Sequence, residues 1–242
     1  MKKILLSLIL LFSVSAIFAQ YNNTPYDFPI KSGSEKWQSF KSVQDMYKAC
    51  QIPIDTLSNL STKALVQTCL NYPAPSILLI HNTPQQGLNE WKQHFNGIDE
   101  LFIRSDAKEE LINTYKSFNI KGYEKLKTDI EKGKYTFQLQ MLEAIIAQEE
   151  IIGKLNESQK KQILKTCLSN YQLIEADQVY GFTNLESTGR IIIKLANSLG
   201  NQSIKEKIQS KDIQEFINTG FLSDRETFLQ IISEAKKVDT NE

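Results

Sequence analysis

His81 and His94 are the only two histidines in the chain, and with neighbouring acids they could be drawn as a metal site. The acidic residues near them in sequence are Glu90, Asp99 and Glu100. Their spacing matches none of the metal-ligand patterns, such as two histidines four residues apart on one helix. We therefore expect no metal and no cofactor, and we expect both histidines to lie on loops or at the surface.

Adjacent carboxylates are frequent, but the sequence does not direct two of them to one place. The pairs are Asp99-Glu100, Glu109-Glu110 and Glu149-Glu150. Neighbouring acids on a helix point in different directions and usually face water, whereas a glycosidase needs two carboxylates in one cleft. The chain also has no nucleotide-binding glycine loop, nucleophile elbow or zinc-protease helix. The sequence therefore assigns no catalytic residue.

Three cysteines and two tryptophans each allow a structural and a functional interpretation. An odd number of cysteines cannot all pair within one molecule. Cys50, Cys69 and Cys167 each fall on an apolar helical face, which favours small buried hydrophobes over a disulfide with one free thiol. Trp37 and Trp91 could stack on a sugar, yet both also fall on apolar helical faces. Core packing is the preferred interpretation for all five residues.

The helix expected from Ser61 to Tyr72 is the clearest of the elements that would position these side chains. Leu65, Cys69 and Tyr72 share one helical face, Ser61 is a suitable N-cap and Pro73 ends the hydrogen-bond ladder. The tripeptide Thr-Cys-Leu at 68–70 recurs at 166–168. This echo suggests two related helical blocks, although a match this short also arises by chance.

Capping signals and periodicity predict helices along most of the remaining chain. Ser32 and Glu35 have the spacing of a capping box and predict a helix that continues towards Cys50. Asn156 and Gln159 have the same spacing before the segment that contains Cys167. No stretch alternates apolar and polar residues in the manner of a strand. We predict an all-α fold, a multi-helix array or bundle, with two repeat-like halves as one arrangement.

Proline usage and glycine-rich breaks suggest the order of segments along the chain. All six prolines lie at or before Pro84, so the helices beyond it are free to be long. The expected segments are a signal peptide at 1–19, an extended arm at 20–31, a first helical half at 32–118, a connector at 119–134, a second helical half at 135–238 and a disordered tail at 239–242.

The first nineteen residues have the pattern of a secretory signal peptide. Two lysines precede an apolar run from Ile4 to Val14, and Ala19 provides a small residue at the expected cleavage position before Gln20. The run is too short for a comfortable membrane span, which disfavours a retained anchor. We therefore expect a protein exported to the periplasm or the extracellular space, and not an integral membrane protein.

The charge balance excludes one class of partner. Without Lys2 and Lys3 the chain carries two more acidic than basic residues, and it has no basic stripe. A nearly neutral chain offers no electrostatic basis for binding nucleic acid.

Several short blocks resemble uncharacterised exported proteins of Gram-negative anaerobic bacteria. The blocks are Gly33-Ser34-Glu35-Lys36-Trp37, Cys50-Gln51-Ile52-Pro53, Leu60–Pro73 and Phe95-Asn96-Gly97. The similarity is clear over roughly the first hundred residues after the signal peptide and faint beyond them. It implies an exported bacterial protein and assigns no activity.

Two functions remain compatible with these observations. The first is a non-catalytic helical binding or scaffold protein with a protein or glycan partner, which the absence of catalytic motifs favours. The second is a hydrolase-type enzyme whose site assembles from scattered carboxylates with His81 and His94. A buried cluster of ionisable groups in a cleft would favour the second.

Overall fold

The structure, a computed structural model, describes residues 23–200 and 202–239. Every regular element in these residues is a helix, and none is a strand, which confirms the predicted all-α class. The chain divides into two compact units. The first consists of the described part of Met1–Ala74 together with His94–Arg104, and the second of Pro75–Gln93 together with the described part of Ser105–Glu242.

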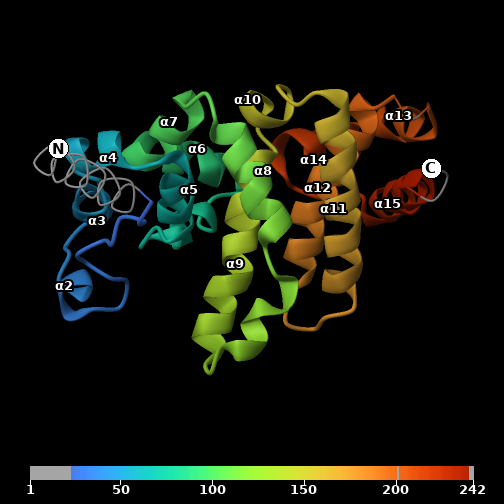
Figure 1. Cartoon of the computed structure of the whole chain (residues 1–242). Coiled ribbons are helices and arrows are strands. Elements are labelled where there is room, and N and C mark those ends of the chain that lie inside the picture. Colours follow the sequence, from blue (N-terminus) through green and yellow to red (C-terminus); the bar gives the residue numbers. More distant parts are fainter. Residues whose placement is uncertain (1–22, 201, 240–242) are drawn as a thin grey trace, which may run out of the picture. The chain divides into compact units, whose positions relative to one another are not determined.

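The first unit is built from short helices (Figure 1). They are α2 (Glu35–Gln38), α3 (Val43–Ala49), α4 (Ile54–Asn59), α5 (Thr62–Leu70) and α7 (Asn96–Ile103). Helix α5 packs on α7 and buries most of its residues, among them Leu65 and Cys69, which are both 0% exposed. The predicted N-cap Ser61 accepts a hydrogen bond from the backbone N–H of Ala64 at 3.2 Å, as expected.

Arg104 holds the end of α4 against the end of α7. Its Nη1 donates to Leu60 O at 2.6 Å and its Nη2 to Leu57 O at 2.9 Å, while Nε pairs with Glu100 at 2.9 Å. The last carbonyls of a helix have few partners within that helix, so the guanidinium supplies a donor to Leu60 O and a second donor to Leu57 O, which also accepts from the Leu60 N–H. One side chain thereby satisfies the C-terminus of a short helix that has little stability of its own.

The second unit contains the longer helices. Its elements are η1 (Pro75–Leu78), α6 (Pro84–His94, of which His94 belongs to the first unit), α8 (Ala107–Ser117), η2 (Ile120–Lys125), α9 (Asp129–Ile146), α10 (Glu149–Ile152), α11 (Glu157–Glu175), α12 (Phe182–Ser198), α13 (Gln202–Ile208), α14 (Lys211–Thr219) and α15 (Arg225–Asp239). Both α9 and α11 begin with a complete capping box, at Thr128–Glu131 and at Asn156–Gln159. The second of these boxes was predicted from the sequence.

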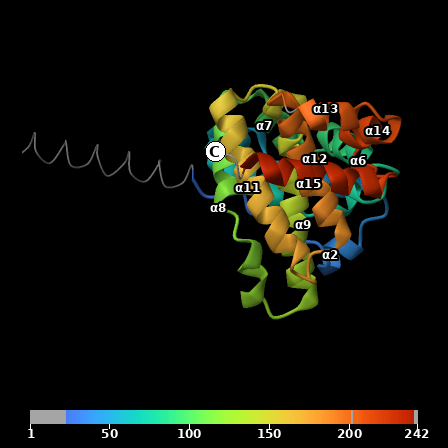
Figure 2. The same cartoon turned by 90° about the vertical axis from the view of Figure 1, so that its right-hand side faces the viewer.

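Helix α12 is the centre of the second unit. It packs against α9, α11, α13, α14 and α15, and Figure 2 shows the long helices side by side. Its residues 188–193 are all buried, including Arg190. A helix that is covered all round must bury any polar residue it carries, so its polar groups need partners inside the protein.

Gly189 sets how closely α15 approaches α12. A Cβ atom there would lie 2.4 Å from Cε2 of Phe228. We expect Gly189→Ala to destabilise the second unit by about 1–3 kcal/mol, because the ring has to move out of its packed position. Gly133 on α9 has nothing within 4 Å of such a Cβ. Gly133→Ala should therefore stabilise by up to about 1 kcal/mol through helix propensity alone. Thermal unfolding of both variants checks the pair, and a shift in the same direction for both would contradict this packing.

Three predictions made from the sequence can be compared with the observed helices. The single helix expected to follow Ser32 is in fact two short helices, with N-caps at Ser34 and Ser42, and neither buries a residue. That prediction was wrong because the hydroxyls of Ser39 and Ser42 bond locally and interrupt the ladder. The expected connector at 119–134 contains η2 and the start of α9 and lies inside the second unit. The repeat relation between the segments around Cys69 and Cys167 remains a prediction.

The predicted signal peptide at 1–19 lies outside the described residues, as do 20–22 of the arm and 240–242 of the expected tail. Within the described ranges no helix combines the length and apolar character needed to cross a bilayer.

Candidate functional site

Glu143 is a carboxyl buried in the middle of the second unit. It lies on α9 and is 1% exposed. It belongs to the segment Met141–Ile146, and the other five residues of this segment are all apolar. Because α9 packs against both α8 and α12, its side chain is enclosed by residues from neighbouring helices and not by water.

Two hydroxyl groups approach the same oxygen of this carboxyl. Tyr115 on α8 donates to Oε1 at 3.0 Å. The Oγ1 of Thr188 on α12 lies 2.7 Å from Oε1 of Glu143 and 3.0 Å from Asn184 O. The hydroxyl proton of Thr188 can therefore be donated to either oxygen. The other carboxyl oxygen, Oε2, is buried and accepts no hydrogen bond from any described residue. An unsatisfied buried oxygen is uncommon and calls for a physical explanation.

Burial raises the pKa of Glu143 to about 7, against the opposing effect of the Thr188, Ser187 and Tyr115 hydroxyls. Removal from water disfavours the charged carboxylate, and hydroxyl donors compensate for only part of that loss. Glu143 is therefore present in both the neutral and the ionised form near neutral pH. A perturbed carboxyl of this kind at a cavity wall is a recognised marker of a functional site.

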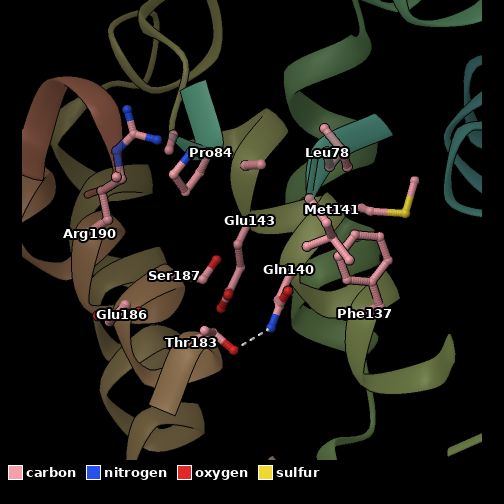
Figure 3. Close-up of a pocket in the computed structure, with 14 residues that line it drawn as sticks. Leu78, Pro84, Phe137, Gln140, Met141, Glu143, Thr183, Glu186, Ser187 and Arg190 are labelled. Carbon is pink, nitrogen blue, oxygen red and sulfur yellow. Dashed lines mark hydrogen bonds between the residues drawn. The ribbon is translucent and has the colours of Figure 1, made fainter. Parts of the chain in front are cut away.

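Glu143 lines a cavity of about 150 Å³ within the second unit. Figure 3 shows its carboxyl between Ser187 on one side and Gln140 on the other. Most of the remaining wall is apolar and comes from α6, α9 and the ends of η1 and α9; these residues are Leu78, Leu79, Pro84, Phe137, Met141, Ala144 and Ala147. The cavity thus combines a largely apolar lining with several polar side chains, among which the buried carboxyl of Glu143 has one oxygen that accepts no hydrogen bond from the described residues.

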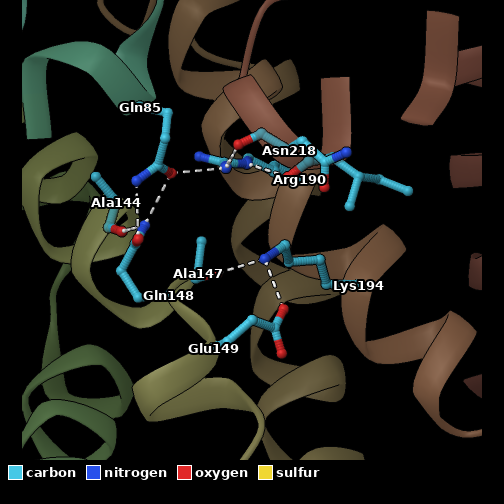
Figure 4. Close-up of polar contacts among 9 residues, drawn as sticks. Gln85, Ala144, Ala147, Gln148, Glu149, Arg190, Lys194 and Asn218 are labelled. Carbon is cyan, nitrogen blue, oxygen red and sulfur yellow. Dashed lines mark hydrogen bonds and ion pairs between the residues drawn. The ribbon is translucent and has the colours of Figure 1, made fainter. Parts of the chain in front are cut away.

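Arg190 forms the opposite part of the wall and is held by groups from two other helices. Its Nε donates to Ile217 O at 2.9 Å, and its Nη2 donates to Asn218 O at 2.7 Å and to Gln85 Oε1 at 3.0 Å (Figure 4). Burial lowers the pKa of Arg190 to about 10, so the guanidinium remains charged at neutral pH. The residue joins α6, α12 and the C-terminal end of α14 around the cavity.

A chain of polar contacts continues from Gln85 along the same wall. Gln85 and Gln148 exchange two amide hydrogen bonds, of 2.9 and 3.2 Å (Figure 4). Gln148 also donates to Ala144 O at 2.9 Å. Further along, Lys194 donates to Ala147 O at 2.7 Å and pairs with Glu149 at 3.0 Å. These bonds satisfy the polar groups at the C-terminal end of α9 and fix the wall that Ala144 and Ala147 contribute.

The residues singled out from the sequence lie elsewhere. His81 follows η1 in the second unit, and His94 stacks on Tyr47 in the first unit with ring centroids 4.4 Å apart. Both are partly buried, and neither lines the Glu143 cavity. Within the described residues no group of histidines, cysteines and acids is arranged to hold a metal ion.

The interpretation of the cysteines as core residues is confirmed. Cys50, Cys69 and Cys167 are unpaired and at most 1% exposed. Trp91 is 0% exposed, as expected of a core residue, whereas Trp37 is only partly buried and packs edge-on against Phe40.

Glu143 and Arg190 were missed by sequence reasoning, although a signal was present. Each is an ionisable residue inside an apolar run, Glu143 within 141–146 and Arg190 directly before three consecutive isoleucines. A charge that falls on the apolar side of a helix is expected to be buried, and buried charges are rare unless they are paired or functional.

No protein-family model matches this chain. Neither a curated protein nor a solved structure shows significant similarity to it.

Proposed function

We propose that this is a non-catalytic binding protein whose second unit holds a small molecule in the Glu143 cavity. The observation that carries the proposal is the combination of a largely apolar wall with a buried carboxyl whose Oε2 accepts no hydrogen bond from the described residues. Small-molecule sites are typically apolar concavities with a few placed polar groups. Glu143 fits the role of the polar group that orients a ligand.

The size of the cavity indicates the size of the ligand. A dry apolar cavity of roughly 150 Å³ in another protein accepts benzene, and the volume here is about 150 Å³ as well. A six-membered ring with one polar substituent therefore fits. A sugar ring fits less well, because its hydroxyl groups would meet Phe137, Met141 and Leu78 without hydrogen-bond partners.

Filling the cavity should abolish binding. We expect Ala144→Leu to remove the space for a ring, because Ala144 lines the cavity. The measurement is thermal unfolding with toluene, benzyl alcohol, benzylammonium or benzoate as the probe. A probe at about ten times its Kd should stabilise the wild-type protein by about 1.4 kcal/mol and should leave Ala144→Leu unchanged.

Ala176→Leu is the matched control for this experiment. It makes the same substitution at the exposed end of α11, away from the cavity lining, and it should respond to the probes like the wild-type protein. If none of the four probes stabilises the wild-type protein, or if Ala144→Leu responds as strongly, the proposal is wrong.

A hydrolase is the second candidate, and one observation favours it. A carboxyl with a pKa of about 7 can exchange protons near neutral pH, and the Ser187 hydroxyl lies close enough to lower that pKa. Turnover of a p-nitrophenyl ester that is lost in both Glu143→Gln and Ser187→Ala would establish this alternative. Binding of the probes without turnover of any ester would favour the binding protein.

We propose further that the protein is exported, on the strength of the charged and apolar pattern of residues 1–19. The mature chain should then begin at Gln20 or within a residue or two of it. Intact-mass measurement on protein recovered from the envelope or medium of a Gram-negative host checks this. A product that retains Met1 would contradict it.

A further inference from the structure

The two oxygens of Glu143 differ in what they can still bind. Oε1 already has hydroxyl donors from Tyr115 and Thr188 at 3.0 and 2.7 Å. Oε2 accepts nothing from the described residues, although it is buried. A partner for this carboxyl must therefore be a hydrogen-bond donor, and the cavity is the space from which a molecule outside the chain can supply one.

No basic side chain that the structure describes is paired with the carboxyl, although Arg190 lines the same cavity. The titratable or charged groups around it are Tyr115 on α8, Cys167 on α11, Tyr180 before α12, and Glu186 and Arg190 on α12. Burial and hydroxyl groups set the pKa of Glu143, and among the described residues no basic side chain contributes to lowering it. The Nε and Nη2 atoms of Arg190 donate to Gln85 and to the backbone at the end of α14. The ionised form of Glu143 is thus a buried charge without an ion-pair partner among the described residues.

We infer that the ligand carries a protonated amine on a compact apolar group, with its N–H donating to Oε2 of Glu143 and its apolar part lying against Phe137 and Met141. This inference rests on the proposed function and specifies the chemistry of the ligand. An ammonium group supplies both the missing donor and the missing positive charge. A charge-assisted hydrogen bond of this kind is about twice as strong as one between neutral groups.

A ligand with an alcohol or a carboxylate in place of the ammonium group would satisfy Glu143 less completely. An alcohol would donate one hydrogen bond to Oε2 but would leave the ionised carboxylate without a counter-charge. A carboxylate ligand would require Glu143 to be protonated, and it would lie near Glu186, a second acidic residue of the lining. Arg190 also lines the cavity, but its Nε and Nη2 are bonded to Gln85 and to the backbone of α14. Of the three head groups, only the cation is stabilised by both acidic residues.

Three probes that share one ring separate these possibilities: benzylammonium, benzyl alcohol and benzoate. Isothermal titration calorimetry on the full chain should show benzylammonium binding at least about tenfold more tightly than benzyl alcohol near pH 8. The affinity for benzylammonium should weaken roughly 30-fold from about pH 8 to about pH 5.5, because the proton on Glu143 competes with the cation. The affinity for benzyl alcohol should change much less over the same range.

Glu143→Gln is the matched variant, because it keeps the shape of the side chain and the acceptor for Tyr115. It should lower the affinity for benzylammonium to that for benzyl alcohol and should remove the pH dependence. Ala144→Leu should instead abolish binding of all three probes. Since the pH dependence is measured on the wild-type protein, the inference is testable even if Glu143→Gln does not fold.

The outcomes test the ammonium inference separately from the proposed small-molecule binding on which it rests. Equal affinities for the three probes, or tighter binding of benzoate, would overturn the ammonium inference and leave the cavity as a binding site. Absence of binding by every probe at every pH would overturn both.

Discussion

We expect Cys167→Glu to destabilise the second unit by about 3–5 kcal/mol, the cost of an uncompensated charge in a protein core. Cys167 is 0% exposed on α11, and burial raises the pKa of its thiol, which is therefore neutral. A carboxylate at this position would lie beside Glu143, whose charge already acts on Cys167. Thermal or urea unfolding measures the effect.

Two further variants show that the effect comes from burial of charge. Cys167→Ala removes one small apolar group and should cost only about 1 kcal/mol. Ser169→Glu places the same carboxylate on an exposed position of the same helix and should change stability by less than about 0.5 kcal/mol. If Cys167→Glu unfolds like Ser169→Glu, the packing of α11 described above is wrong.

The same substitution at Cys69 in the first unit should cost less stability than at Cys167. Cys69 is also 0% exposed, but the charge of Arg104 acts on it and lowers its pKa against the larger effect of burial. A nearby cation stabilises a carboxylate. Cys69→Glu should therefore destabilise the first unit by less than Cys167→Glu destabilises the second.

The second large effect is a loss of stability as the pH rises from about 4 to about 7. The pKa of Glu143 in the folded protein is about 7, whereas a glutamate in an unfolded chain titrates near ~4.3. Between these values the folded state binds one more proton than the unfolded state, so the free energy of unfolding falls as the pH rises. The contribution is complete below about pH 4 and lost above about pH 7, and it amounts to roughly 3–4 kcal/mol.

Glu143→Gln isolates this contribution, because other acidic groups also change the pH dependence. Burial raises the pKa of Glu186, which acts in the same direction, while hydrogen bonds lower the pKa of Asp224 and of Glu131. These groups are present in both proteins, so their effects cancel in the difference. At about pH 8 the variant should unfold roughly 5–10 °C above the wild-type protein, and at about pH 4 the two should nearly coincide. A constant difference across this range would show that Glu143 does not titrate with a raised pKa.

The local features of the fold could be predicted from the sequence because they depend on neighbouring residues. The N-cap at Ser61 and the capping box from Asn156 to Gln159 follow from spacings of three residues, and the structure contains both. The burial of Cys69 and Trp91 follows from helical periodicity. Each of these features depends only on residues within one helical turn or one helix.

The candidate site could not be predicted because it depends on which helices meet. Tyr115, Glu143 and Thr188 come from α8, α9 and α12, and nothing in their local sequence links them. Helical periodicity assigns each residue to a face, but it does not say which faces pack together. The close approach at Gly189 was likewise unpredictable, since it depends on Phe228 of another helix.

Whether the Glu143 carboxyl is buried at the wall of a ligand cavity can be measured through its own titration. Carbon-13 NMR of the glutamate side-chain carboxyls, assigned with Glu143→Gln, gives the pKa of this group alone. We expect a pKa of about 7 in the free protein and a clear decrease when benzylammonium is added. A Glu143 signal that titrates together with the exposed glutamates, near ~4.3, and does not respond to the probe would contradict both expectations.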